Sequence, residues 1–168
     1  MEVLKKAFIS ICIIISFLNA ERPLQVGEKF TYDIWYNFIK GGESWMEISG
    51  VDTINNKALY HITSVTRSTG VVDLLFGIND KLQSWIDPET FYSYMFEKRI
   101  REGKYKKDYY VQFNYKDSLA FSNEDTTRIT PPIHDALSIF YYLRKAPLDT
   151  GKIFKVNNFD SDTLKNYN

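Results

Sequence analysis

The side chains that most often carry catalysis are few in this chain of 168 residues. It has two histidines, His61 and His134, and one cysteine, Cys12. A zinc site made of three histidines, or of cysteines with histidines, therefore lacks ligands. The sequence also has no G-x-S-x-G, P-loop or G-x-G-x-x-G motif, so the usual indications of a serine hydrolase, a nucleotidase or a dinucleotide-binding enzyme are missing. We expect no metal and no cofactor.

Paired carboxylates are the remaining catalytic hypothesis, because a glycosidase acts through two of them. Asp33 and Glu43 flank an expected hairpin, and Asp80 and Asp87 lie at the two ends of an expected strand. Acids on the outer side of a strand are normally solvated or paired with lysine or arginine, and their positions in the sequence fix no separation. We therefore rank a carboxylate-dependent hydrolase below non-catalytic functions.

The longest helical pattern runs from Thr130 to Arg144. Thr130 is the expected N-cap, and Pro131 fits the first helical position, where a missing N–H costs nothing. On one face Asp135 and Ser138 lack a histidine base, which makes the serine a poor nucleophile. We interpret Asp135 and Arg144 as charges that complement the two helix ends. The apolar residues recur at helical spacing on the opposite face: Ile133, Ala136, Leu137, Phe140 and Leu143.

Outside this segment, alternating apolar and polar residues favour strands. The pattern is clearest from Phe30 to Ile39, and Lys40–Glu43, with its two glycines, is the expected hairpin turn. Aromatic residues make up 16% of the chain and lie mostly in such runs, which favours a β-rich domain. We predict a mainly β (β-rich α+β) fold. It is a curved antiparallel meander sheet or partly open barrel, with the one long helix packed on its concave face.

A short apolar segment from Val71 to Phe76 lies between glycines and is expected to form a helical turn. It either closes one end of the curved sheet or stays exposed as a lid or contact patch. An exposed patch would indicate a binding site, because monomers seldom leave such patches uncovered. The candidate ligand contacts are this segment's apolar residues and one from the helix: Val71, Leu74, Leu75, Phe76 and Phe140.

Residues 1–20 have the pattern of a secretory signal peptide. Lys5 and Lys6 precede an apolar run from Ala7 to Leu18. The run is shorter than the roughly 20 residues that span a bilayer, so we expect no transmembrane span after signal removal. Residues 21–168 then form a single β-rich domain without disulfides, since Cys12 leaves with the signal.

The formal net charge of the chain is +0, and its one basic cluster, Lys98 to Lys107, straddles an expected turn and is interrupted by acids. This pattern is more typical of a solvated hairpin tip than of a nucleic-acid surface. Contact with anionic lipid headgroups or surface polysaccharide is the less favoured interpretation. We expect no nucleic-acid partner.

Six segments in order resemble a family of exported bacterial proteins catalogued as domain of unknown function 3108: Val26–Asp33, Gly41–Glu43, Asp80, Trp85–Thr90, Glu102–Lys107 and Pro131–Arg144. The resemblance implies a signal-bearing envelope protein with a curved antiparallel sheet and no assigned activity. Members usually continue past the position of Asn168, so we expect this chain to be truncated at its C-terminal end. The family-motif positions, which we interpret as structural, are Asp33, Asp80, Asp87, Pro88, Asp135, Ser138 and Arg144.

These observations favour an exported protein of the bacterial periplasm or outer envelope that is not an enzyme. Its first candidate function is that of a non-catalytic binding or carrier module for an apolar or lipid-like ligand. The second is a structural or assembly protein that binds an envelope protein partner or polysaccharide through its sheet edge or hairpin tip.

Overall fold

The computed structural model describes residues 24–146 and 149–167. The expected signal peptide and Pro147 lie outside this range. The described elements are β1 (Lys29–Tyr36), β2 (Ile39–Ile54), β3 (Lys57–Ser68), α2 (Gly70–Leu75), β4 (Asn79–Ile86), β5 (Ser93–Glu102), β6 (Tyr105–Asn114), β7 (Leu119–Ser122), β8 (Thr126–Arg128), α3 (Ser138–Lys145), β9 (Val156–Asp160) and β10 (Thr163–Tyr167).

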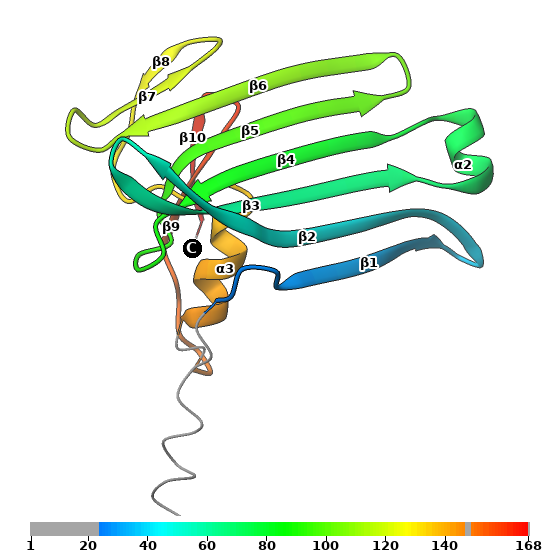
Figure 1. The fold of residues 1–168 in the computed structure, drawn as a ribbon, viewed down its shortest axis with the longest axis horizontal. Coiled ribbons are helices and arrows are strands. Elements are labelled where there is room, and N and C mark those ends of the chain that lie inside the picture. The colour runs from blue at the N-terminus through cyan, green and yellow to red at the C-terminus, as the bar shows by residue number, and fades with distance from the viewer. Residues whose placement is uncertain (1–23, 147–148, 168) are drawn as a thin grey trace, which may run out of the picture.

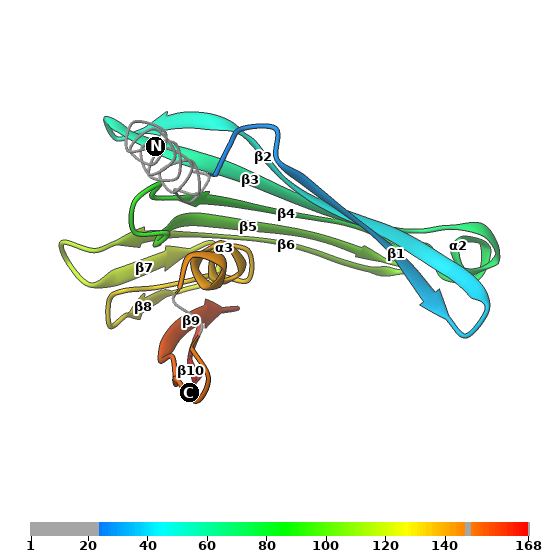
Figure 2. The same cartoon turned by 90° about the horizontal axis from the view of Figure 1, so that it is seen from below.

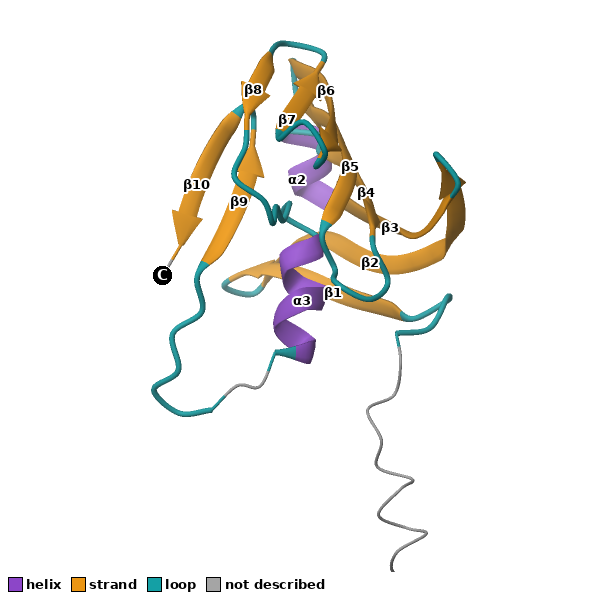
Figure 3. Cartoon of the chain, turned by 90° about the vertical axis from the view of Figure 1, so that its left-hand side faces the viewer, coloured by secondary structure: helices purple, strands orange, loops and turns teal. Residues whose placement is uncertain are grey.

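The predicted antiparallel meander is confirmed. Strands β1 to β8 form one sheet in chain order, and each pairs antiparallel with the next (Figure 1). The sheet is open, because β1 and β8 are its two edges. Strands β9 and β10 form a separate hairpin outside this sheet (Figure 3).

The first hairpin turns at Asn37 and Phe38 instead of at Lys40–Glu43. Asn37 has a φ of 53°, in the left-handed region that asparagine tolerates better than most residues. The glycine pair lies inside β2, where a Cβ added to Gly42 would come within 2.6 Å of the carbonyl oxygen of Arg67. The glycine therefore permits close approach of β2 and β3 and makes no turn.

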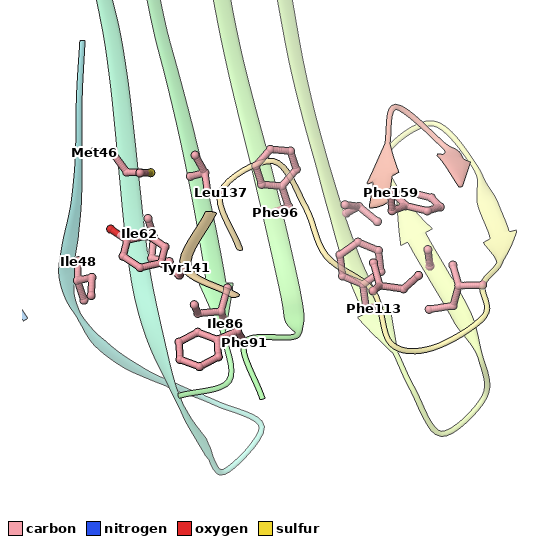
Figure 4. Packing of buried hydrophobic residues seen from close by; sticks show 14 of the residues in the cluster. Met46, Ile48, Ile62, Ile86, Phe91, Phe96, Phe113, Leu137, Tyr141 and Phe159 are labelled. Carbon is pink, nitrogen blue, oxygen red and sulfur yellow. The ribbon is translucent and has the colours of Figure 1, made fainter. Parts of the chain in front are cut away.

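The hydrophobic core lies on one face of the sheet, at the end away from α2 (Figures 1 and 4). Leu137 and Tyr141 of the α3 region pack there against the sheet, and Tyr141 is fully buried. The hairpin of β9 and β10 extends this core, since the ring of Phe159 meets that of Phe113 edge-on at 5.4 Å. We call this side of the sheet the core face and the opposite side the outer face.

The long helix expected from Thr130 to Arg144 is not confirmed, because α3 has only eight residues and begins at Ser138. The preceding residues are engaged in other contacts: the carbonyl oxygen of Ile133 accepts a hydrogen bond from the N–H of Ser93, and His134 pairs with β9 at Asn158. Backbone groups used in this way cannot take part in a helix. The eight-residue helix covers only one end of the sheet (Figure 2).

The start of α3 is fixed by the Asp135 side chain. Its Oδ1 accepts hydrogen bonds from the N–H groups of Leu137, at 2.7 Å, and Ser138, at 2.9 Å. Ser138 Oγ in return accepts from the N–H of Asp135 at 2.8 Å. This reciprocal pattern resembles a capping box, which satisfies donors that a helix start leaves free.

Asp135 also joins α3 to the sheet. It is fully buried, and its Oδ2 accepts a hydrogen bond of 2.6 Å from Ser84 Oγ in β4. Burial raises the pKa of this carboxyl, while the hydrogen bonds from Ser84 and from the backbone of Ser138 and Leu137 oppose that rise.

We predict that Asp135→Ala lowers the free energy of unfolding by about 3 kcal/mol, because the buried Ser84 hydroxyl and two N–H groups lose their acceptor. Urea denaturation followed by circular dichroism measures the change. Asp149→Ala is the control, since Asp149 has an 80% exposed side chain and a surface substitution costs about 0.5 kcal/mol or less. Equal losses in the two variants would contradict the role given to Asp135.

Candidate functional site

Four of the five expected ligand contacts lie together on or beside α2, which contains no buried residue. The predicted helical turn is confirmed there. Leu74 and Leu75 are the most exposed, at 87% and 82%. Phe76 remains 50% exposed, although its ring lies close enough to Gly103 that an added Cβ would meet it at 2.8 Å.

Polar and backbone contacts hold α2 to the end of the sheet. Asp73 Oδ1 accepts a hydrogen bond of 2.6 Å from Ser68 Oγ, and the N–H of Thr69 donates to the carbonyl oxygen of Gly41 in β2 at 3.0 Å. The N–H of Gly103 donates to the carbonyl oxygen of Gly77 at 2.8 Å. The residues just before and just after α2, Thr69 and Gly77, therefore attach the helix to the sheet, while its leucines face away from the protein.

The turn between β1 and β2 and the start of β6 lie at the same end of the sheet (Figures 1 and 2). They add further exposed apolar side chains, of which Phe38 is 86% exposed. Contiguous exposed patches of this kind mark interaction sites in soluble domains. We name this region the apolar end and define it by eight exposed residues: Trp35, Phe38, Ile39, Val71, Leu74, Leu75, Phe76 and Tyr105.

Phe140, the fifth expected contact, lies at the other end of the sheet on α3 (Figure 1). Its ring packs edge-on against Phe30 at 5.5 Å and against Tyr141 at 5.4 Å. The structure therefore brings four of the five candidate residues together and leaves Phe140 in the packing beneath the sheet.

The first expected carboxylate pair does form, since Asp33 and Glu43 are opposite each other in β1 and β2. Lys40 Nζ lies between them, 2.8 Å from Asp33 and 2.6 Å from Glu43. These contacts raise the pKa of Lys40 above its ordinary value. A lysine shared by both acids is the surface pairing expected of acids on strands.

Asp80 and Asp87 lie at opposite ends of β4 and do not meet. Asp80 accepts a hydrogen bond of 2.7 Å from the N–H of Arg101. Asp87 Oδ2 pairs with Lys57 Nζ at 2.5 Å, and its Oδ1 accepts from the N–H groups of Glu89 and Thr90. Burial opposes ionisation of Asp87, but these partners hold its pKa below the ordinary value. Pro88 lies within this turn.

Arg144, the last motif position, is close to the N-terminal strand. Its Nη2 pairs with Glu28 Oε1 at 2.7 Å, and its guanidinium lies over the ring of Phe30 at 5.0 Å. Arg144 therefore links α3 to β1, and its position at the end of α3 also suits the negative helix C-terminus.

His134 is the residue that the sequence analysis missed beside Asp135 and Ser138. Ser138 Oγ lies 3.5 Å from His134 Nδ1, which brings a serine, a histidine and an aspartate into one cluster. His134 and Ser138 are four residues apart and would be neighbours on one face of a helix as well, so the spacing could have indicated this contact. All three residues are buried, and burial lowers the pKa of His134 to about 4. The cluster is closed to solvent and connects α3 with the sheet and β9.

Within residues 24–146 and 149–167, no three His, Cys, Asp or Glu side chains gather closely enough to hold a metal ion. Over the same residues, no helix has the length and apolar character needed to cross a membrane. The expectation that the protein needs no metal or cofactor stays a prediction.

Comparison with known proteins gives one result. The model of a family described as "Protein of unknown function (DUF3108)" matches residues 31–168, which confirms the resemblance seen in the sequence segments. No curated protein and no solved structure matches the chain.

We predict that His134 makes the stability of the protein depend on pH. Its pKa is about 4 when folded and roughly 6.5 when unfolded, so the unfolded chain binds a proton first as the pH falls. The stability from neutral His134 is complete above pH ~6.5 and is lost towards pH ~4, at about 1.4 kcal/mol per pH unit.

His134→Phe keeps an aromatic ring beside Tyr92 and Tyr142 and removes the titration. Urea denaturation of both proteins across this pH range measures the effect. The advantage of the native protein over the variant should shrink as the pH falls. A constant difference would show that His134 does not titrate in this way.

Proposed function

We propose that this chain, which belongs to the DUF3108 family of proteins of unknown function, is a non-catalytic module whose apolar end binds a lipid-like ligand. The observation that carries the proposal is the exposure of Leu74, Leu75 and Phe38 at one end of the sheet. Burying a leucine or phenylalanine side chain fully contributes about 1.5–3 kcal/mol, so a few such residues suffice for reversible binding.

The arrangement of the apolar end favours a lipid surface over a small enclosed ligand. Five of its residues lie on α2 or on turns beyond the strands, and Trp35, Ile39 and Tyr105 lie at strand ends, so they can enter an acyl layer while most of the hydrogen-bonded sheet stays outside (Figure 2). Trp35 and Tyr105 add aromatic rings with polar atoms, a type enriched where membranes meet water. The ligand in this proposal is therefore lipid presented as an assembled surface.

The cellular location in this proposal is the bacterial envelope, in the periplasm or at the outer envelope. It rests on the signal-peptide pattern of residues 1–20. An exported chain meets lipid surfaces directly, so export and lipid binding support each other.

A non-catalytic role is supported by the positions of the groups that could do chemistry. His134, Asp135 and Ser138 are buried, so a substrate has no access to them. Asp33 and Glu43 share Lys40, and Asp87 pairs with Lys57. A hydrolase acting through these acids remains the least favoured candidate.

One observation favours the second candidate, an assembly protein that binds another envelope protein. Strand β1 is an edge of the sheet, and Tyr32 and Ile34 on it are 46% and 45% exposed. An exposed edge can accept a further strand from a partner through main-chain hydrogen bonds. This candidate explains β1 and leaves the apolar end on α2 unexplained, so we place it second.

We predict that the protein without residues 1–20 floats with phosphatidylcholine vesicles in a density gradient, and that Leu74→Asp/Leu75→Asp abolishes flotation. A charge placed where an acyl chain should contact the protein opposes entry into the layer. Both leucines are highly exposed, so the variant should keep the native denaturation midpoint within error.

Val51→Asp/Phe121→Asp is the matched control, because Val51 and Phe121 are exposed apolar residues away from α2. It should float like the native protein. A native protein that stays at the bottom of the gradient would contradict lipid binding and move the preference to the assembly role.

A further inference from the structure

The outer face carries a basic hollow close to the apolar end. The hollow has a volume of about 220 Å³, and four cations from three adjacent strands line it, with Val65 and Asn79 and no acid: Arg67 of β3, Lys81 of β4, and Arg99 and Arg101 of β5. Pockets for drug-sized molecules measure roughly 300–1,000 Å³, so this hollow suits one charged group of a larger molecule.

Three of these four cations have no acidic partner among the described residues. Arg101 pairs with Asp108 at 2.7 Å. Arg67 donates to the amide oxygen of Asn79 and lies over the ring of Trp45. Its cross-strand neighbour Glu43 pairs with Lys40 and forms no ion pair with Arg67. Lys81 and Arg99 form no ion pair within the described chain.

The register of the sheet places two of these cations side by side, although Asp108 of β6 lies opposite Arg99 on its other side. Lys81 and Arg99 are direct cross-strand neighbours in β4 and β5. Like charges at directly opposite positions of an antiparallel pair destabilise it. An anion bound between them would remove the repulsion, and the guanidinium of Arg99 can donate two parallel hydrogen bonds to a phosphate.

A second hollow continues from the first and shares Lys81 and Arg99 with it. Its volume is about 420 Å³, and its lining includes Gln83, Asn123 and Tyr110. Two acids also line it, Glu97, which accepts a hydrogen bond from Gln83, and Asp108, which pairs with Arg101. These side chains can hydrogen-bond uncharged hydroxyl groups. The two hollows together therefore fit an anionic group that carries a polar, uncharged substituent.

The cations lie near the ends of strands that lead to the apolar end. Arg67 is the residue before the last of β3, Arg101 is the residue before the last of β5, and Lys81 is two residues into β4. At about 3.3 Å per residue, these three lie within about 7 Å of their strand ends along the strand, and Arg99, three residues before the end of β5, lies about 10 Å from it. When the apolar end contacts an acyl layer, these side chains are at the depth of the headgroups.

We propose that the basic hollow binds the phosphate of an anionic phospholipid headgroup while the apolar end enters the acyl layer. The proposal rests on the lipid-binding function above and adds its lipid class. Arg67, Lys81 and Arg99 bind the phosphate, and the shared second hollow accepts the headgroup's hydroxyl groups.

The experiment compares vesicles of phosphatidylcholine alone with vesicles that also contain phosphatidylglycerol, at low and high ionic strength. The native protein should bind the mixed vesicles more tightly, and salt should remove the difference. Each cation near the surface contributes about a fivefold gain in affinity, so Lys81→Gln/Arg99→Gln should lose the gain by a factor on the order of 25. Its binding to phosphatidylcholine alone should not change.

Lys116→Gln/Arg128→Gln is the matched control, since it removes the same charges at exposed positions on the other end of the sheet. It should keep the phosphatidylglycerol preference. An equal loss in both variants would overturn the site and show only a general charge effect, and no loss in Lys81→Gln/Arg99→Gln would also overturn it. That variant should keep the native stability to urea, because it removes no ion pair.

Titration with glycerol 1-phosphate, followed by NMR, separates failure of this inference from failure of the proposed function. Vesicle binding without a phosphatidylglycerol preference would leave the apolar end as the lipid site and overturn the basic hollow. No vesicle binding, together with glycerol 1-phosphate binding that Lys81→Gln/Arg99→Gln abolishes, would overturn the lipid source and assign the hollow to a soluble phosphate ester.

Discussion

The buried carboxylate of Asp135 is the constraint on which the packed end of this protein depends. A carboxylate without water must be surrounded by donors, and here they come from β4 through Ser84 and from the first N–H groups of α3. The backbone next to it serves two further elements, because Ile133 accepts from Ser93 of β5 and His134 exchanges two hydrogen bonds with β9. The three residues Ile133, His134 and Asp135 therefore connect α3 with β4, β5 and the β9–β10 hairpin.

The same constraint limits how much of the sheet is covered. Because α3 cannot begin before the Asp135 cap, it has eight residues and a length of about 12 Å. The twelve residues of β3 extend about 40 Å. A helix so much shorter than the strands covers one end only. The apolar end therefore lies beyond the reach of α3.

The sequence predicts features that depend on residue alternation and fails where the backbone makes long-range contacts. Alternation in Phe30–Ile39 and its neighbours was enough for the meander, because a period of two is local. The prediction that Gly42 forms a turn is wrong, because the close contact that requires this glycine is with the carbonyl of Arg67 on another strand. The predicted helix is longer than α3 because the helical spacing already includes Ile133, although the backbone hydrogen bonds of Ile133 and His134 go to β5 and β9.

Strand register also explains why the basic hollow was not recognised in the sequence. The run from Lys98 to Lys107 is one basic cluster in the sequence, but alternate residues of a strand face opposite sides. Arg99 and Arg101 face the outer side, whereas Lys98 pairs with Asp160 of the β9–β10 hairpin. Arg67 and Lys81, which complete the hollow, are distant in sequence and become neighbours only through the pairing of β3, β4 and β5.

The packed end of the sheet is separate from the uncovered end. The uncovered end can therefore carry charged and apolar groups that would destabilise the core. Opposed like charges and exposed leucines lower stability or solubility. Here the leucines lie at the opposite end of the sheet from the Asp135 network, and Lys81 and Arg99 lie on the opposite face from the core. The attraction of the basic hollow for an anion and the apolar contact of the leucines also differ in range. Electrostatic attraction acts over about 10 Å and is screened by salt, whereas apolar contact acts only on touching surfaces. Because the basic hollow lies on the outer face near the strand ends, attraction would turn that face towards an anionic layer before the apolar end enters it.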